Sequence, residues 1–151
     1  MRHSTARAIG IRILFALAMA MALIALANTT FAAEETGIGS ITAKGAGSAK
    51  LTSSGTITIA GGAGIVWVTG DADISTSGRG RRTTLPDGTI RLTGYSGTIT
   101  ISGESLVVRI EGGAINLTAT GTGSVLLKGR GSYQVGDTTG TWSKSGTSVR
   151  F

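Results

Sequence analysis

Two groups of charged side chains near the middle of the sequence are candidates for binding chemistry. The stretch "GDADIS" places Asp71 and Asp73 two residues apart, so in a strand both carboxylates lie on one face. Carboxylate oxygens are the ligands that calcium prefers, but a bound calcium ion needs about six or more of them. The pair therefore predicts a calcium site if the fold adds further oxygens, and a solvated strand edge if it does not.

The second group is basic. The stretch "GRGRRTTLPDG" contains Arg79, Arg81 and Arg82, and the planar guanidinium group suits sulfate, phosphate or carboxylate. These arginines predict a site for an acidic glycan or another anionic envelope surface. The alternative is an edge strand that its charges keep from pairing with other chains.

Several kinds of catalysis are excluded by residue type and spacing. His3 is the only histidine and there is no cysteine, so a chain without its first residues has no imidazole or thiol for nucleophilic or zinc chemistry. Glu104 and Glu111 bound one expected strand and would lie roughly 20 Å apart. A glycosidase pair needs about 5 to 10 Å. We predict no catalytic residues and no cofactor.

Residues 1–33 have the pattern of an export signal. Arg2, Arg7 and Arg12 precede or open the uncharged run "ILFALAMAMALIALA", which is shorter than the roughly 20 residues of a membrane span. Small residues follow it and predict cleavage near 27–33. We therefore expect a periplasmic, cell-surface or secreted protein with no membrane span after cleavage; the alternative is a retained anchor.

Loss of residues 1–33 also leaves too little positive charge to indicate a nucleic-acid partner. Removing its three arginines lowers the formal net charge from +6 to +3. Nucleic-acid binding normally requires a dense basic face, so we do not expect a nucleic-acid partner.

The remaining residues, 34–151, predict a single all-β domain. From Ile41 onward apolar and polar residues alternate, as in strands with one wet face. We expect an antiparallel meander closed as a sandwich or barrel, with a β-solenoid as the alternative. The alternation changes parity at Tyr95-Ser96, Gly103-Glu104 and Gly112-Gly113, which predicts two-residue hairpin loops. "LPDGT", at 85–89, predicts a further turn.

The alternation of apolar and polar residues continues unchanged through "GTG" and "GRG". There the sequence predicts either three-residue loops or glycine bends within one long strand.

The stretch that contains both motifs is similar to an earlier one. "TAKGAGSAKLTSSGTITI", 42–59, aligns without gaps with "TATGTGSVLLKGRGSYQV", 118–135. The match predicts a partial internal duplication that uses one strand-bend-strand unit twice.

The aromatic residues are interpreted from the same alternation. Trp67 and Tyr133 have the parity of core residues, whereas Tyr95 in a turn and Trp142 near the C-terminus are expected to be more exposed.

Glycine-punctuated units such as "GTITIAG", "GTIRLTG", "GTITISG" and "GSVLLKG" behind a leader resemble exported β-rich bacterial proteins grouped as adhesins with solenoid-like head domains. The resemblance covers most of the chain after the leader and carries over no functional residue. It implies a non-catalytic exported β-module for surface binding, adhesion or envelope structure. The alternative function is a polysaccharide hydrolase or lyase that uses carboxylate, tyrosine or arginine chemistry.

Overall fold

The computed structural model describes residues 39–62 and 64–151, all of which fall in one compact unit. The predicted export signal, 1–33, lies outside the described residues. Within the described residues every regular element is a strand, and no helix is long and apolar enough to cross a membrane. The strands are β1 (Gly39–Ala60), β2 (Ile65–Thr69), β3 (Ala72–Thr76), β4 (Arg81–Thr84), β5 (Ile90–Thr93), β6 (Thr98–Val135), β7 (Thr138–Thr141) and β8 (Thr147–Arg150).

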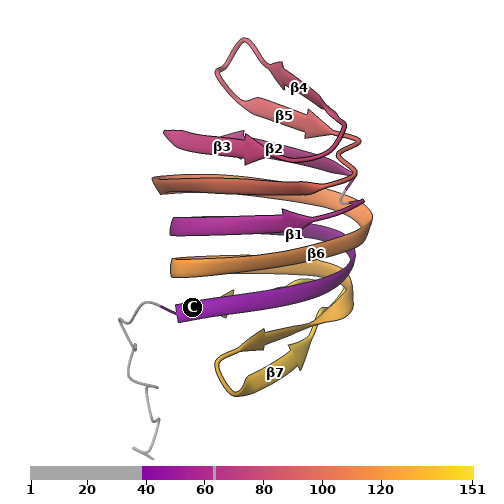
Figure 1. Ribbon diagram of the computed structural model, residues 1–151. Coiled ribbons are helices and arrows are strands. Elements are labelled where there is room, and N and C mark those ends of the chain that lie inside the picture. Colours follow the sequence, from indigo (N-terminus) through magenta and orange to yellow (C-terminus); the bar gives the residue numbers. More distant parts are fainter. Residues whose placement is uncertain (1–38, 63) are drawn as a thin grey trace, which may run out of the picture. The chain divides into compact units, whose positions relative to one another are not determined.

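All eight strands belong to one antiparallel sheet, which confirms the predicted all-β, antiparallel class. The central path is β1-β6-β2-β5-β4, and β3, β7 and β8 each pair with β6. The order does not follow the chain as a meander would, and the sheet does not close into a barrel. The two longest strands, β1 and β6, form the centre of the fold (Figure 1).

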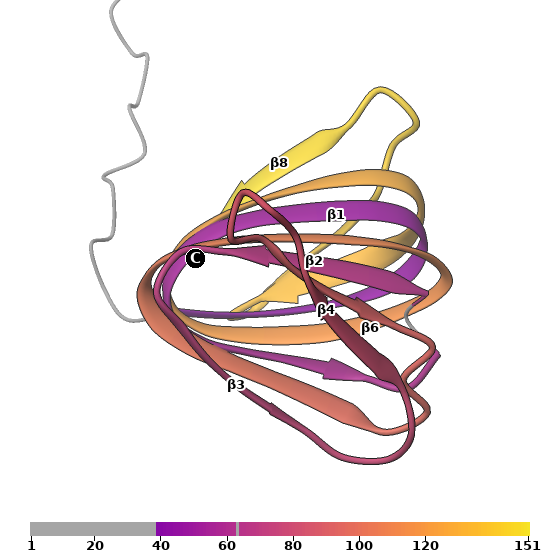
Figure 2. The same cartoon turned by 90° about the horizontal axis from the view of Figure 1, so that it is seen from above.

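The long strands wind around each other as a flattened coil. Thr118 of β6 pairs with Thr42 on one side and with Thr58 on the other, and both partners belong to β1. A strand can border the same neighbour twice only if both strands turn through a full loop. Figure 2, which looks down the coil, shows this looping path.

Flattening of the coil produces two layers of strands that enclose the core. The front layer in Figure 1 consists of β3, segments 98–103, 116–120 and 132–135 of β6, segments 40–44 and 56–60 of β1, and β7. The rear layer consists of β4, β5, β2, segments 106–111 and 124–128 of β6, segment 48–53 of β1, and β8. The sandwich is therefore made by one continuous sheet that folds back on itself. Coils also stack in the solenoid alternative, but here all pairings between named strands are antiparallel.

Glycines form the corners where the long strands bend from one layer to the other. Gly47 pairs with Gly129, and Gly55 pairs with Gly121. These four residues have φ between 129° and 138°, and an added Cβ would lie 2.1–2.2 Å from a carbonyl oxygen of the paired strand. Only glycine fits both constraints. Of the two explanations for the unchanged parity, the glycine bend within one long strand is confirmed.

The hairpins predicted at Gly103-Glu104 and Gly112-Gly113 are wrong, because β6 runs through both sites without a break. Between the pairs Gly55–Gly103 and Ser53–Leu106, β6 contains one more residue than β1, and the same excess occurs between Gly47–Gly112 and Gly45–Ile115. An extra residue in one strand is a β-bulge, and it reverses the parity of all later side chains. Neither Gly112 nor Gly113 has the positive φ expected of a tight hairpin.

The turn predicted at 85–89 is present. In the β4–β5 turn, Gly88 N–H donates to Leu85 O at 2.9 Å, Leu85 N–H donates to Thr89 O at 2.8 Å, and Gly88 has a φ of 82°. Tyr95-Ser96 lies in the short connection between β5 and β6. The two-residue hairpin predicted there is also wrong, because β5 pairs with β2 and β4 and not with β6.

Aromatic residues close the two ends of the core. Tyr95 and Tyr133 are partly buried against it, and their rings occupy the space that side chains at Gly80 and Gly140 would need. Trp142, predicted to be more exposed, is only 6% exposed and its indole N–H donates to Ser132 O at 3.1 Å.

The two similar stretches of sequence are partners in the sheet. Residues 42–59 pair antiparallel with 134–117, so nearly all of the first stretch borders the second. The pair Lys50–Leu126 lies at the centre of this ladder and also at equivalent positions of the sequence alignment. The two stretches are thus related by a local twofold axis at that pair.

Candidate functional site

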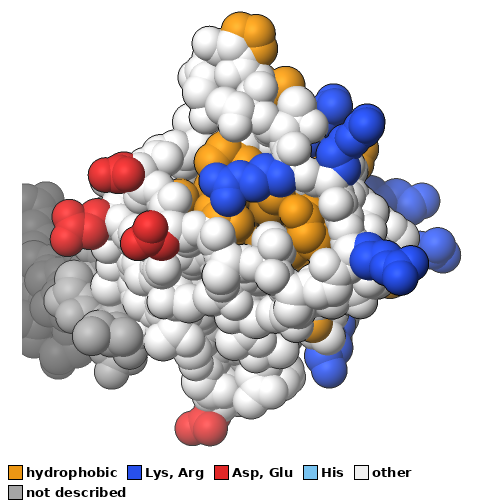
Figure 3. All heavy atoms as spheres, turned by 45° about the horizontal axis from the view of Figure 1, so that its top comes forward, with side chains coloured by type: hydrophobic (Ala, Val, Ile, Leu, Met, Phe, Trp, Pro, Cys, Tyr) orange, Lys and Arg blue, Asp and Glu red, His pale blue; other side chains and the backbone are white. Residues whose placement is uncertain are grey.

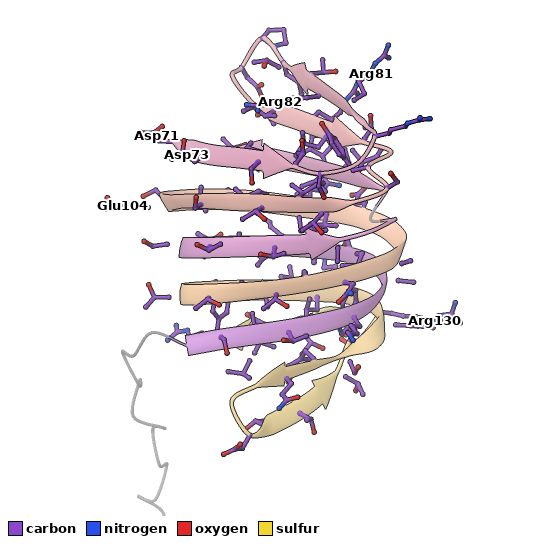
Figure 4. The ribbon with its side chains drawn as sticks, in the orientation of Figure 1. Asp71, Asp73, Arg81, Arg82, Glu104 and Arg130 are labelled. Atoms are coloured by element: carbon purple, nitrogen blue, oxygen red, sulfur yellow. The ribbon has the colours of Figure 1, made fainter. Side chains whose placement is uncertain are left out.

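The structure divides the predicted arginine cluster. Paired residues of neighbouring strands share a face, so Arg81 opposite Thr93 faces outward, and Arg82 opposite the buried Leu92 faces the core side. Arg79 lies in the loop before β4, where its N–H donates to Ser96 Oγ at 3.3 Å. All three arginines are exposed. Figure 4 shows Arg81 and Arg82 extending in different directions, so the three do not form one fork-like site.

Arg82 has a structural explanation. It lies on β4, whose outer side pairs with no other strand within the described chain, and its side chain extends over the end of the core. An inward-facing charge on an edge strand opposes pairing with another chain. Figure 3 shows basic atoms across a hydrophobic area at this end of the coil.

Asp71 and Asp73 do share a shallow pocket, and the structure adds a third carboxylate. The β3–β6 pairing sets Asp73 opposite Ser102, which brings Glu104 to the same corner (Figure 4). The pocket has a volume of about 410 Å³ and is lined by Asp71, Asp73, Ser102, Gly103, Glu104 and Ser105.

The calcium site predicted at Asp71 and Asp73 stays a prediction. Within the described residues, no group of three His, Cys, Asp or Glu side chains is placed to hold a metal ion. The spacing of the two aspartates identified them in the sequence, but it did not identify Glu104. The bulge next to Glu104 changes the alternation of apolar and polar residues in the same way as a hairpin, so the sequence does not show that Glu104 lies near β3.

Asp87 lies away from that pocket, in the β4–β5 turn. Its Oδ1 accepts a hydrogen bond of 2.9 Å from Thr89 N–H. This bond stabilises the charged carboxylate and therefore lowers the pKa of Asp87. The interaction fixes the turn. Among the described residues, neither Asp87 nor an arginine lines the pocket that contains Asp71 and Asp73.

A row of basic side chains around Trp67 crosses the outer surface of the rear layer. Trp67 pairs with Arg91 on one side and with Arg109 on the other, and Arg109 in turn pairs with Lys50. The row thus crosses β5, β2, β6 and β1 in register. We refer to Arg91, Trp67, Arg109 and Lys50 as the basic row.

Trp67 is outside the core, contrary to the sequence prediction. Its neighbours Val66 and Val68 are each 1% exposed and take the core positions, while Trp67 is half-buried on the outer surface. Both parities of "IVWV" are apolar, so the alternation does not determine which set faces inward. A shift of one residue exchanges the two faces of a strand.

Contacts within the basic row hold it in place while leaving cations available. The guanidinium carbon of Arg109 lies 5.2 Å from the centre of the Trp67 ring, within the range of a cation–π interaction. Arg109 also forms an ion pair with Glu111, and the two side chains are 58% and 39% exposed. The buried Nε of Arg91 has no hydrogen-bond partner in the described part of the protein.

Further basic residues extend this surface across the same layer. Arg81 on β4 and Lys128 on β6 are exposed and, by their register with Thr93 and Ser48, face outward like the row. Glu111 is the acidic residue on this surface. The surface can bind anions by charge and planar groups by stacking.

A second hollow lies at the opposite corner from the acidic pocket. It is an open groove of about 720 Å³ formed mainly by small residues and backbone, with Lys44 and Arg130 among its lining residues. Arg130 points away from the corner in Figure 4. Sequence reasoning missed this groove because the corner exists only through the bends of β1 and β6.

No family model matches this chain, and no curated protein or solved structure matches it.

Proposed function

We propose that this protein is a non-catalytic binding module whose rear surface binds an anionic glycan. The observation that carries the proposal is the basic row, in which Arg91, Arg109 and Lys50 lie on the same outer surface as the half-buried Trp67, on four adjacent strands. Guanidinium groups bind carboxylate and sulfate through charge-assisted hydrogen bonds. The indole ring of Trp67 contacts the Arg109 guanidinium through a cation–π interaction and so holds this cation on the surface.

The repetitive spacing of the sheet suits a linear polyanion. Adjacent strands lie about 4.8 Å apart, so the charges recur at multiples of that distance across the layer. A polymer that crosses the strands therefore meets cations on successive strands. Each exposed ion pair contributes at most about 1 kcal/mol, and affinity comes from several weak contacts along one chain.

The rival function, a polysaccharide hydrolase or lyase, has less support. The acidic corner combines Asp71, Asp73 and Glu104, but no arginine, lysine or tyrosine lines that pocket. In the described chain, a clear pKa shift is found for Asp87. This residue lies in a turn and does not line the acidic pocket. Catalytic sites usually contain groups with strongly shifted pKa values.

The binding proposal is tested by titrating the protein with dextran sulfate and polygalacturonate, and in parallel with phosphatidylglycerol vesicles. The variant Lys50→Gln, Arg109→Gln removes two cations of the basic row. The variant Arg79→Gln, Arg82→Gln removes the same charge near the upper edge, outside that surface, and is the matched control. We expect binding to both polysaccharides, weakened much more by the first variant and by added salt.

The other outcomes each refute part of the proposal. Equal losses in the two variants would mean that only net charge matters, and a larger loss in the control would move the site to the predicted arginine cluster. Binding to the vesicles alone would replace the glycan with an anionic membrane surface. No binding to any of the three probes would refute the function.

We further propose that the module is exported, like the adhesin-like proteins that the sequence resembles, and that its paired central segments arose by duplication. The basic front and apolar run of residues 1–33 support export. The local twofold relation about Lys50–Leu126 supports duplication. Mass spectrometry of the protein released by a secreting host should give an N-terminus between Asn28 and Glu35, and a product that retains residues 13–27 would contradict export by cleavage.

A further inference from the structure

The outer surface of the front layer has a regular grid of hydroxyl groups. One line across the strands contains Thr100, Thr58, Thr118 and Thr42, which are direct partners on successive passes of β6 and β1. The neighbouring line contains Ser102, Thr56, Thr120 and Ser40, paired in the same way. We refer to these eight residues as the hydroxyl grid.

The grid is uncharged and faces solvent. Its members are exposed or half-exposed, and the charged residues nearest to it, Asp73 and Lys44, lie beyond its ends in the register. Within the described chain, none of the eight hydroxyls forms a hydrogen bond with another protein group. Each hydroxyl therefore keeps its donor and acceptors for water.

The spacing of the grid is set by the backbone. Hydroxyls recur about 4.8 Å apart from strand to strand and about 6.7 Å apart along a strand, between residues i and i+2. Threonine is stiff at χ1, so its methyl and hydroxyl groups hold fixed positions. The strands of this layer lie side by side in Figure 1, so the two lines of hydroxyls cross four neighbouring strand passes.

These features distinguish the front layer from the rear layer. The rear layer presents flexible cations, whose hydration shells disrupt ordered water. The front layer presents methyl groups and unpaired hydroxyls that repeat both along each strand and from one strand to the next. Water beside methyl groups is orientationally restricted, and hydroxyls at fixed positions can anchor that water. The two spacings are close to the repeats between oxygen atoms on a prism face of hexagonal ice.

We propose that the hydroxyl grid binds the surface of ice. The inference is independent of the glycan-binding function, because it concerns the opposite layer and uses no residue of the basic row. The ligand is crystalline water, held by anchored water molecules that continue the ice lattice.

The test measures ice growth in the presence of the purified protein. Single crystals in a nanolitre osmometer show whether the protein shapes ice and lowers its growth temperature, and frozen sucrose solutions show whether it slows recrystallisation. The grid variant Thr58→Tyr, Thr118→Tyr places bulky rings at the centre of the grid on two paired strands. The control variant Thr52→Tyr, Ser124→Tyr changes an equivalent pair of β1 and β6 in the rear layer.

We expect the parent protein and the control variant to shape ice and slow recrystallisation, and the grid variant to lose both activities. Circular dichroism melts of both variants establish that they remain folded. If either double variant does not fold, the single changes Thr118→Tyr and Thr52→Tyr replace them. Ice growth unaffected by the parent protein, or equal activity in the grid and control variants, would overturn the proposal.

Discussion

Replacing Gly121 with alanine should destabilise the protein far more than replacing Gly113. Gly121 has a φ of 137°, and a Cβ there would lie 2.1 Å from the carbonyl oxygen of Ser54 on the paired strand. The strained conformation costs about 1–3 kcal/mol, and forcing an extra carbon into a packed site costs about 1–3 kcal/mol more. We therefore expect Gly121→Ala to lower the free energy of unfolding by roughly 2–6 kcal/mol.

Gly113 provides the matched control within the same strand. It lies at the bulge on β6, its φ is not positive, and an added Cβ would meet nothing within 4 Å. Alanine there restricts the unfolded chain and should stabilise the protein by up to about 1 kcal/mol.

Urea titrations followed by tryptophan fluorescence, with thermal melts by circular dichroism, measure both changes. At about 4 °C per kcal/mol for a domain of this size, Gly121→Ala should lower the melting temperature by roughly 8–24 °C. Similar melting temperatures for the two variants would refute the role of glycine corners. A large loss for Gly113→Ala would instead restore the hairpin that the structure replaces with a bulge.

Three further predictions concern single residues. Trp142→Phe removes the part-buried hydrogen bond to Ser132 O and should cost about 0.5–1.5 kcal/mol in urea unfolding, the net contribution of a typical hydrogen bond. Ser53→Ala should be neutral or stabilising in the same assay, since the buried Ser53 Oγ has no partner within the described residues. The pKa of Asp87 is lowered in the folded protein, so its contribution to stability is present above the unfolded value of 3.8 and is lost as pH falls through the lower folded pKa. Asp87→Asn should therefore reduce the pH dependence of the melting temperature below about pH 4, and an unchanged acid profile would contradict this.

The strands were predictable because their alternation is a local property. Residues such as Leu117, Ala119 and Leu127 are buried at every second position, and this is also how the sequence presents them. The turn at Leu85–Thr89 is equally local, since proline, aspartate and glycine each favour one position of it. These features depend on residues that are adjacent in the sequence and not on which strands pair with each other.

The candidate sites were less predictable because they depend on register between distant strands. Asp71 and Asp73 were found by their spacing, but Glu104 joins them only through the pairing of β3 with β6. The basic row brings together Arg91, Trp67, Arg109 and Lys50 from four strands. No two members of the row lie near each other in the sequence, so no local pattern identifies them.

The parity changes at Gly103 and Gly112 show why the topology could not be deduced from alternation alone. A two-residue hairpin and a one-residue bulge both exchange the odd and even positions that apolar residues occupy. The hairpin reverses the chain and the bulge does not, yet glycine is favoured at both. What separates them is the partner strand: β1 keeps its own glycines, Gly55 and Gly47, opposite these sites. Glycines in two distant segments can be matched only if the segments are known to be neighbours. The internal similarity of 42–59 and 118–135 covers the other pairing of β1, in which the same two glycines lie opposite Gly121 and Gly129. Because those stretches pair with each other, a repeat in a glycine-rich β-protein can indicate two strands that border one another as well as two separate hairpins.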